Sequence, residues 1–358
     1  MRVLIVAPYG ILGGAELSLL AALERRPADM DPRVLLVADG PLRERLAESG
    51  VPVWLAHGYD GSPDPRALGR FTRSLAALLR EWRPDVVWAL GQKGALLAAP
   101  ACRLAGVPVV WHKVDLSWDR ELAVPLAAAT SGVIAVSEGA ARALGPLRSR
   151  VLAIAPPPVT LAPDLRAPLD GPPTIGMLAR GAPYKGHREL LRAAALLSGE
   201  FPDLRVLASC VPVPEYPGYR GELLALAAEL GLRAELPEWV APEEALPRLT
   251  VLVSATHRDE HGFGYEGFGL TIVEASWAGV PVVVAEGGGA AEALIDGHTG
   301  RLVPDADPSR LAEAIAPYLR DPELRARTGE AGRAFARERF APEVVIPRLF
   351  AALEEAAR

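Results

Sequence analysis

The run Glu266–Ala275 contains the residue types and spacing with the most chemical content in this sequence. Its two carboxylates, Glu266 and Glu274, stand eight positions apart and enclose two glycines. The pattern predicts a helix that begins near Gly269, with Glu266 just before its N-terminus and Glu274 in its second turn. Free N–H groups at a helix N-terminus suit a phosphate, and carboxylates accept hydrogen bonds from sugar hydroxyls. Alternatively, the glutamates are only acidic residues that the helix dipole favours.

Two cations follow the first strand that we expect in the second half of the chain. The strand covers Thr174–Leu178, Arg180 comes two positions after its end, and Lys185 follows five positions later at the start of a helix. A fork-shaped guanidinium and a point-charge ammonium at a helix N-terminus suit a diphosphate. The alternative is a pair of surface cations. The helix dipole disfavours Lys185 at that position, so the pattern favours the functional interpretation.

The hydrophobic pattern supplies a framework that can position these residues. Short apolar runs alternate with amphipathic helices, which predicts parallel sheets with crossover helices on both faces. Ligands of such sheets bind at the carboxyl ends of the strands. In the first half the expected elements are Arg2–Ala7, Ala15–Glu24, Val34–Ala38, Leu42–Glu48, Val51–Leu55, Ala67–Trp82, Asp85–Ala89, Gly94–Leu104, Val107–Trp111 and Val133–Val136.

Prolines crowd residues 156–173, which we interpret as an interdomain linker. The alternation then resumes with Thr174–Leu178, His187–Ser198, Arg205–Ala208, Gly221–Leu230, Val251–Ser254, Leu270–Ala278 and Val280–Ala285. A helical tail is expected over 307–358, broken at Pro322, Pro342 and Pro347.

Length and composition narrow the class of protein. A chain of 358 residues suits two domains, and its net charge of −6 argues against general nucleic-acid binding. We find no signal peptide and no run of about 18–20 apolar residues, so we expect a cytoplasmic protein, with membrane association as an option. Cys102 and Cys210 are far apart in the sequence and are interpreted as buried thiols.

Residues 266–284 resemble the signature of the retaining glycosyltransferases of family 4, also called group 1. The resemblance implies an α/β fold of the GT-B type, with two doubly wound Rossmann-like domains facing across a cleft. The expected domains are an acceptor-side domain at 1–165, a nucleotide-sugar-binding domain at 166–342, and a last helix at about 343–358 that packs back on the first domain.

This resemblance also implies the reaction and the roles of individual residues. A sugar would pass from a nucleoside diphosphate sugar to an acceptor hydroxyl with retention of configuration, without a metal or other cofactor. Arg180 and Lys185 would neutralise the leaving diphosphate, and Glu266 would hold the donor sugar. The remaining donor-binding positions in this motif are Phe268, Gly269, Leu270 and, at the ribose, Glu274.

Other positions match the family less specifically. Gly13 and Gly14 follow the first strand, where the family has a loop near the donor phosphates or the acceptor, although a tight turn alone also explains them. His112 stands where the family often has a histidine near the donor sugar, with a packed core histidine as the alternative. Lys113 follows it in place of the usual aspartate. Val240 lies in the segment expected to touch the base, where Trp239 departs from the pattern.

Two further segments admit a second interpretation. The segment His257–His261 has residue types that bind metals, but its spacing fits no recognised site, and we favour a solvated loop that closes over the donor. The basic amphipathic helix over Arg66–Arg83 is a candidate for peripheral membrane contact, against the commoner case of a core-facing helix with a solvated basic side. For the acceptor, which is a small molecule, a glycan or a lipid-linked molecule, position alone suggests Trp111, Lys113, Trp118 and Asp119.

Two other functions stay open on the sequence alone. A nucleotide-sugar epimerase of the same fold would act on its donor without an acceptor. A non-catalytic binding protein is the other alternative, and the presence of Arg180, Lys185, Glu266 and Glu274 together argues against it.

Overall fold

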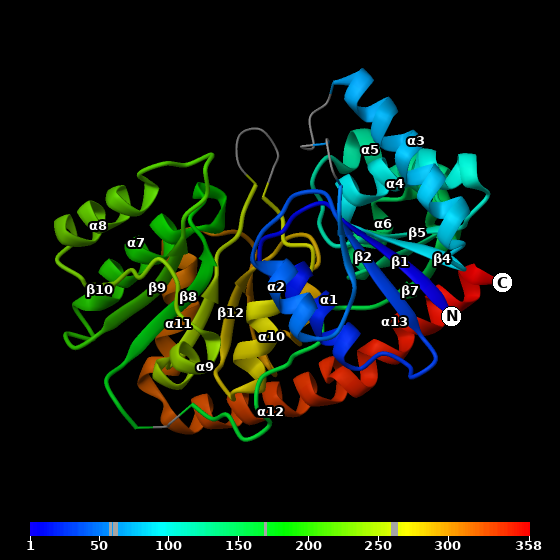
Figure 1. Ribbon diagram of the computed structural model, residues 1–358. Helices are drawn as coiled ribbons and strands as arrows, with labels where there is room; N and C mark the ends of the chain where they lie inside the picture. The colour runs from blue at the N-terminus through cyan, green and yellow to red at the C-terminus, as the bar shows by residue number, and fades with distance from the viewer. Residues whose placement is uncertain (57–58, 60–63, 168–169, 259–263) are drawn as a thin grey trace. The chain divides into compact units, whose positions relative to one another are not determined.

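The computed structural model describes residues 1–56, 59, 64–167, 170–258 and 264–358 (Figure 1). The chain divides into two compact units. Unit 1 comprises Met1–Pro158 together with Pro342–Arg358, and unit 2 comprises Val159–Ala341. The chain therefore passes between the units twice, once after Pro158 and once after Ala341.

Unit 1 is built on a parallel sheet in the order β3-β2-β1-β4-β5-β6-β7. Apolar and β-branched runs form its strands, and the central strands are buried on both faces, as expected for a covered parallel sheet. The strands are β1 (Arg2–Ala7), β2 (Asp31–Leu36), β3 (Val53–Leu55), β4 (Val86–Leu90), β5 (Val109–Lys113), β6 (Gly132–Ala135) and β7 (Val151–Ile154). All their pairings are parallel.

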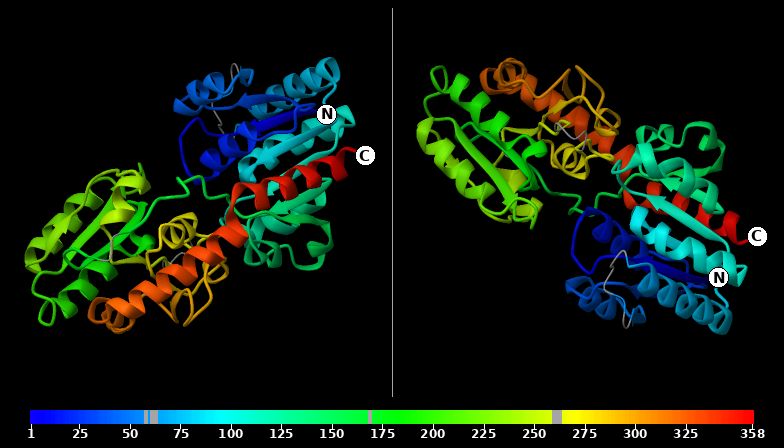
Figure 2. Two further views of the ribbon diagram at one scale, coloured as in Figure 1. Left: turned by 90° about the horizontal axis from the view of Figure 1, so that it is seen from below. Right: turned by 90° about the horizontal axis from the view of Figure 1, so that it is seen from above.

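Helices cover both faces of this sheet. The helices are α1 (Gly14–Glu24), α2 (Pro41–Glu48), α3 (Pro65–Trp82), α4 (Gly91–Ala105), α5 (Asp119–Ala129), α6 (Glu138–Arg142), α13 (Pro342–Ala357) and the 3-10 helix η1 (Gly145–Arg150). One core contains residues of α1, α2 and α13, and the other contains residues of α3, α4 and α5. Figure 2 shows α13, the red C-terminal helix, running along the strands of unit 1, where it contacts β4, β5, β6 and β7.

Unit 2 repeats the plan with the strand order β10-β9-β8-β11-β12-β13, again all parallel. The strands are β8 (Thr174–Arg180), β9 (Arg205–Val211), β10 (Arg233–Glu235), β11 (Val251–Ser254), β12 (Val282–Ala285) and β13 (Gly300–Val303). The helices are α7 (His187–Ser198), α8 (Tyr219–Glu229), α9 (Pro242–Ala245), α10 (Leu270–Trp277), α11 (Pro308–Arg320), α12 (Pro322–Phe340) and the 3-10 helices η2 (Pro183–Lys185), η3 (Leu246–Arg248) and η4 (Ala290–Ala293).

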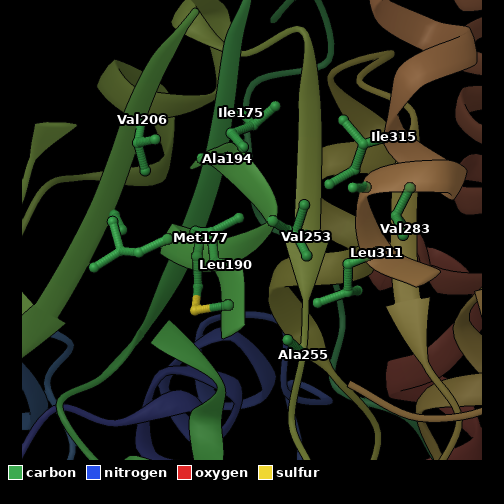
Figure 3. Packing of buried hydrophobic residues seen from close by; sticks show 14 of the residues in the cluster. Ile175, Met177, Leu190, Ala194, Val206, Val253, Ala255, Val283, Leu311 and Ile315 are labelled. Atoms are coloured by element: carbon green, nitrogen blue, oxygen red, sulfur yellow. The ribbon is translucent and has the colours of Figure 1, made fainter. Parts of the chain in front are cut away.

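The core of unit 2 lies between its sheet and two helices that are distant in the sequence. Figure 3 shows side chains of the strands meeting side chains of α7 and α11, among them Ile175, Val253, Leu190 and Leu311. On the opposite face α10 packs against β11, β12 and α12. Two parallel sheets with helices on both faces confirm the predicted doubly wound α/β class.

The strand order of each unit reverses beside one strand, and this fixes where ligands can bind. In unit 2 the chain moves outward from β8 to β9 and β10, then returns to β11 on the other side of β8. The loops after β8 and β11 therefore diverge, and such switch points form crevices at the carboxyl edge of a sheet. The corresponding point in unit 1 lies between β1 and β4.

The proline-rich segment is less free than the sequence suggested. Arg333 of α12 is 1% exposed, and its guanidinium donates to the carbonyls of Leu165 and Trp277 at 2.6 Å each. It also donates to Pro163, and the N–H of Val159 donates to the carbonyl of Phe340 at 2.9 Å. The first half of the predicted linker is thus fixed to unit 2.

Some elements escaped the sequence prediction. The predicted break at Pro347 is wrong, because α13 continues through it and buries Val345, Ile346, Leu349 and Leu353 in unit 1. The loss of one helix hydrogen bond is outweighed by this packing. The short edge strands β7, β10 and β13 were not predicted, because three or four residues give little periodicity. The helix α5, which has 11 residues, was also not predicted.

Candidate functional site

The loop after β8 is held in a single shape by glycine. Lys185 ends the 3-10 turn η2, and Gly186 follows in the left-handed region with φ +85°. A Cβ atom on Gly186 would lie 2.3 Å from the carbonyl oxygen of Ala255, so only glycine allows the loop to approach the end of β11 this closely. The N–H of His257 donates to the carbonyl of Tyr184 at 2.9 Å and ties the two loops together.

Lys185 and Glu266 meet at this switch point. The Lys185 ammonium forms an ion pair with the Glu266 carboxylate, and both side chains are largely buried. Thr256, two residues after the end of β11, donates its hydroxyl to the same carboxylate oxygen at 2.9 Å. Burial raises the pKa of Glu266, but the charge of Lys185 and the two hydrogen bonds outweigh it, so the pKa of Glu266 is lowered. Thr256 was not identified from the sequence, although its position after a strand was a usable signal.

Arg180 is the third charged group at this edge. It is the last residue of β8 and is exposed, and its guanidinium lies 3.2 Å from the hydroxyl of Tyr184. Its positive charge also contributes to the lowered pKa of Glu266. The structure therefore brings Arg180, Lys185 and Glu266 together, although 86 positions separate the first from the last in the sequence.

The glycine motif before α10 places a helix N-terminus at the same edge. Gly269 has φ +96°, and a Cβ there would lie 2.5 Å from the Ile272 side chain. Phe268 is buried, with its ring centroid 5.1 Å from that of Phe340 at the end of α12. The N–H groups of the first turn of a helix lack acceptors within the helix. The amides of Phe268, Gly269 and Leu270 thus stand at a helix N-terminus beside Glu266, and their binding to a phosphate stays a prediction.

Glu274 lies in the second turn of α10 and differs sharply from Glu266. Its side chain is 8% exposed, and the structure records no hydrogen bond to its carboxylate from the residues that it describes. Burial, together with the negative charge of Glu243 in α9, raises the pKa of Glu274 to about 8. Val240, predicted to touch the base, comes shortly before α9 and is half-buried, so its loop leads into the helix whose charge acts on Glu274.

The predicted site residues of unit 1 are at the carboxyl edge of its sheet. Gly13 caps α1, and its N–H donates to the buried Glu16 carboxylate at 3.2 Å. Gly14 is the first residue of that helix. This capping arrangement by itself accounts for the two glycines structurally, so their contact with a ligand stays a prediction.

His112 is buried at the end of β5 in a defined state. The indole N–H of Trp88 donates to Nδ1 of His112 at 3.2 Å, which makes that nitrogen the acceptor. Burial lowers the pKa of His112 to about 4, so the ring is neutral at pH 7 and its proton is on Nε2. Within the residues that the structure describes, this buried Nε2 has no hydrogen-bond partner. A donor of this kind suits an oxygen of a ligand.

Other predicted segments give a mixed result. In the segment His257–His261, residues 259–261 lie outside the described residues; Arg258 stacks on the ring of Tyr265 at 4.4 Å. In the described ranges no group of three His, Cys, Asp or Glu is placed to hold a metal.

The basic helix α3 turns its apolar stripe inward, with Phe71, Leu75 and Leu79 in the core of unit 1. This leaves mainly the arginine side of α3 exposed, so the predicted membrane contact gains no support. Across the part of the chain that the structure describes, no helix has both the length and the apolar character that spanning a membrane requires.

Both halves of the chain match known families. Residues 13–156 match the family model "Glycosyl transferase 4-like domain", and residues 166–335 match "Glycosyl transferases group 1". The second match contains Arg180, Lys185 and the Glu266–Glu274 motif, and the first contains His112.

Curated relatives match over part of their length. A D-inositol 3-phosphate glycosyltransferase of Streptomyces coelicolor is 38% identical over 162 residues, which is 42% of this chain and 33% of the relative. A GDP-mannose-dependent alpha-(1-6)-phosphatidylinositol monomannoside mannosyltransferase of Mycolicibacterium smegmatis is 32% identical over 169 residues, 46% of this chain and 43% of the relative. The matched segment therefore spans less than half of each of these relatives.

A solved structure matches almost the whole chain. The Anabaena protein Alr3699/HepE, solved in complex with UDP-glucose, has a TM-score of 0.83 and 22% identity, and the match covers 99% of this chain and 100% of that one. At 22% identity, this similarity shows that the two proteins share a fold.

Proposed function

The chain belongs to the group 1 glycosyltransferases, and from this premise we propose that it transfers a sugar from a nucleoside diphosphate sugar to an acceptor hydroxyl with retention of anomeric configuration. The observation that carries the proposal is the meeting of Arg180, Lys185, Glu266 and the N-terminus of α10 at one switch point. Two cations, a row of amides and a hydroxyl-binding carboxylate are the groups that a sugar diphosphate requires.

In this proposal the chain stabilises the departure of the diphosphate. The bond between the anomeric carbon and the diphosphate oxygen breaks, and Arg180 and Lys185, with the amides of Phe268–Leu270, stabilise the developing charge. Glu266 accepts hydrogen bonds from hydroxyls of the donor sugar. Glu274 accepts from the ribose, with Val240 near the base. No metal takes part in these steps.

The acceptor then completes the transfer. Its oxygen forms the new bond to the anomeric carbon on the face that the diphosphate leaves, and its proton passes to a diphosphate oxygen. His112, neutral with a proton on Nε2, is proposed to donate to an oxygen of the donor sugar. Gly13 and Gly14 are proposed to approach the donor phosphates or the acceptor through their backbone.

The relatives support a nucleotide-sugar donor and leave its base open. The Mycolicibacterium smegmatis relative is named for GDP-mannose, whereas the Anabaena protein was solved with UDP-glucose. We therefore propose a nucleoside diphosphate sugar as the donor class. The acceptor is a small molecule, a glycan or a lipid-linked molecule.

A panel of UDP, GDP, ADP and dTDP sugars in thermal-shift assays identifies the donor, because a ligand of the native state raises the melting temperature. With that donor, Lys185→Ala should lower turnover, including slow donor hydrolysis, by several orders of magnitude. Arg188→Ala is the matched control. Arg188 lies three positions after Lys185 and is partly exposed, and its guanidinium pairs with Glu222. Near-normal turnover by Lys185→Ala would sink the assignment.

The same preparation separates transfer from epimerisation. An epimerase of this fold would convert the donor sugar without any acceptor, and NMR of the donor with the protein alone would reveal the second epimer. Under our proposal only hydrolysis products form in that experiment.

A further inference from the structure

A buried polar network in unit 1 lies at the carboxyl end of β5. Lys113 is fully buried, forms an ion pair with Asp119, the first residue of α5, and donates to the carbonyl of Asp115 at 2.7 Å. Gln92, in the first turn of α4, donates to the same Asp119 carboxylate at 3.2 Å. Burying an ion pair costs desolvation free energy even when each group finds partners. The Lys113–Asp119 pair therefore contributes mainly by fixing the arrangement of the chain around it.

What this network fixes is the loop 114–118. The N–H of Ser117 donates to the Asp115 carboxylate at 2.9 Å, and the carbonyl of Trp118 accepts from Leu122 at 2.9 Å. Both ends of the loop are thereby held, one by Lys113 and the other by Asp119 and the first turn of α5.

Trp118 is held in this loop in an unfavourable state. It has φ +55°, in the left-handed region that bulky residues avoid, and its side chain is 55% exposed. The other described non-glycine residue with positive φ, Arg83, ends helix α3, where this conformation is ordinary. A large aromatic residue that is both strained and exposed indicates selection for what its ring contacts.

A second exposed aromatic residue lies in another loop at the carboxyl edge of the same sheet. The ring of Tyr9, in the loop after β1, is 45% exposed and stacks with the ammonium of Lys93 at 5.0 Å. Lys93 is the neighbour of Gln92, which contacts Asp119 beside Trp118. The first turn of α4 therefore contacts both segments, the loop after β1 through Lys93 and the start of α5 through Gln92.

We infer that Trp118 binds the acceptor and that the acceptor is a glycoside, whose pyranose ring stacks its C–H face on the indole. A pyranose has an apolar C–H face that can stack on an exposed indole, and Tyr9 offers a second exposed ring at the carboxyl edge of the same sheet. The inference rests on the proposed glycosyl transfer, because it names the substrate that receives the sugar.

Saturation-transfer NMR with simple glycosides tests this inference without any donor. The probes are the methyl pyranosides of glucose, galactose, mannose and N-acetylglucosamine, with octyl glucoside to separate ring from alkyl contacts. We expect ring protons of at least one methyl pyranoside to be saturated by the wild-type protein. Trp118→Ala should raise its Kd roughly tenfold, and Trp118→Tyr should retain most of the binding. The matched control is Leu104→Ala, which removes an exposed apolar side chain from the last turn of α4.

Trp118→Gly separates a binding role from a structural one. Glycine relieves the strain at φ +55°, so this variant should lose glycoside binding with no loss of melting temperature. Equal binding by Trp118→Ala and the wild type would overturn the inference. It would also be overturned if only the octyl chain of octyl glucoside were saturated, or if none of the probes were saturated. Lys185→Ala should bind the glycoside normally, so failure of the donor site and failure of the acceptor site give different results.

Discussion

Replacing Glu274 by glutamine tests the electrostatics of the proposed donor site. Burial, with the charge of Glu243, raises the pKa of Glu274 from 4.5 to about 8. Between these values the folded protein holds a proton that the unfolded chain releases. This contribution to stability is fully present below the unfolded pKa and is lost as the pH rises through the folded pKa. At about 1.4 kcal/mol for each pKa unit, the loss is roughly 5 kcal/mol.

A glutamine side chain has nearly the same shape and carries no proton equilibrium. Near pH 5, where Glu274 is protonated in the fold, the wild type and Glu274→Gln should therefore differ little in free energy of unfolding. From pH 5 to 8 the variant should gain about 1.4 kcal/mol per pH unit relative to the wild type. At pH 8 and above the variant should therefore be the more stable protein by roughly 4 kcal/mol, although it has lost a residue proposed to bind the ribose.

Urea unfolding curves at pH 5, 7 and 9, followed by tryptophan fluorescence, measure this difference. Two controls on α9 sharpen it. Glu243→Gln should reduce the loss at high pH, because the charge of Glu243 helps to raise the pKa of Glu274. Glu244→Gln makes the same change at the next exposed position and should leave the pH profile unaltered. Parallel profiles of the wild type and Glu274→Gln from pH 5 to 9 would refute the reasoning.

Two further predictions concern the same edge of unit 2. Gly186→Ala should lower the free energy of unfolding by more than about 1 kcal/mol and abolish the donor-dependent thermal shift, because the new Cβ meets Ala255. Gly218 has a similar φ and open space around it, so Gly218→Ala should lower the free energy of urea unfolding by only about 1 kcal/mol and keep the thermal shift. Donor binding at pH 7 should release close to one proton, because Glu274 ionises when it accepts from the ribose, and it should release much less at pH 9. Calorimetry in buffers of different ionisation enthalpy measures this proton release. Heats of binding at pH 7 that do not depend on the buffer would contradict the prediction.

The sequence predicted the framework of the site well because periodicity and local motifs encode it. The helix His187–Ser198 and the strand Val251–Ser254 occur with the predicted bounds. Gly186 and Gly269 occupy left-handed positions that other residues avoid, so their place in the motifs reflects backbone geometry. Such features are local, and a single sequence displays them.

Contacts between distant segments were beyond the sequence. Nothing near His112 indicated that Trp88, 24 positions earlier, would fix its tautomer. Lys113 is a candidate for the acceptor site by its position in the sequence, yet it is fully buried and donates to the carbonyl of Asp115 in the loop beside it. These outcomes depend on strand order and register, which place residues of β4 beside residues of β5.

The two glutamates of the motif show why identical side chains can need different ligands. Glu266 is already satisfied by Lys185 and Thr256, so a diphosphate that takes the ammonium of Lys185 leaves this carboxylate in need of new donors. Hydroxyls of the sugar attached to that diphosphate can supply them, which couples recognition of the phosphate to recognition of the sugar. Glu274 carries its electrostatic cost before any ligand arrives, and a ribose diol offsets it by donating to the ionised form. Glu266 therefore exchanges its hydrogen-bond partners when the donor binds, and Glu274 gains hydrogen bonds from the ribose. Because a bare diphosphate offers neither sugar nor ribose hydroxyls, it should bind less well than the full nucleotide sugar.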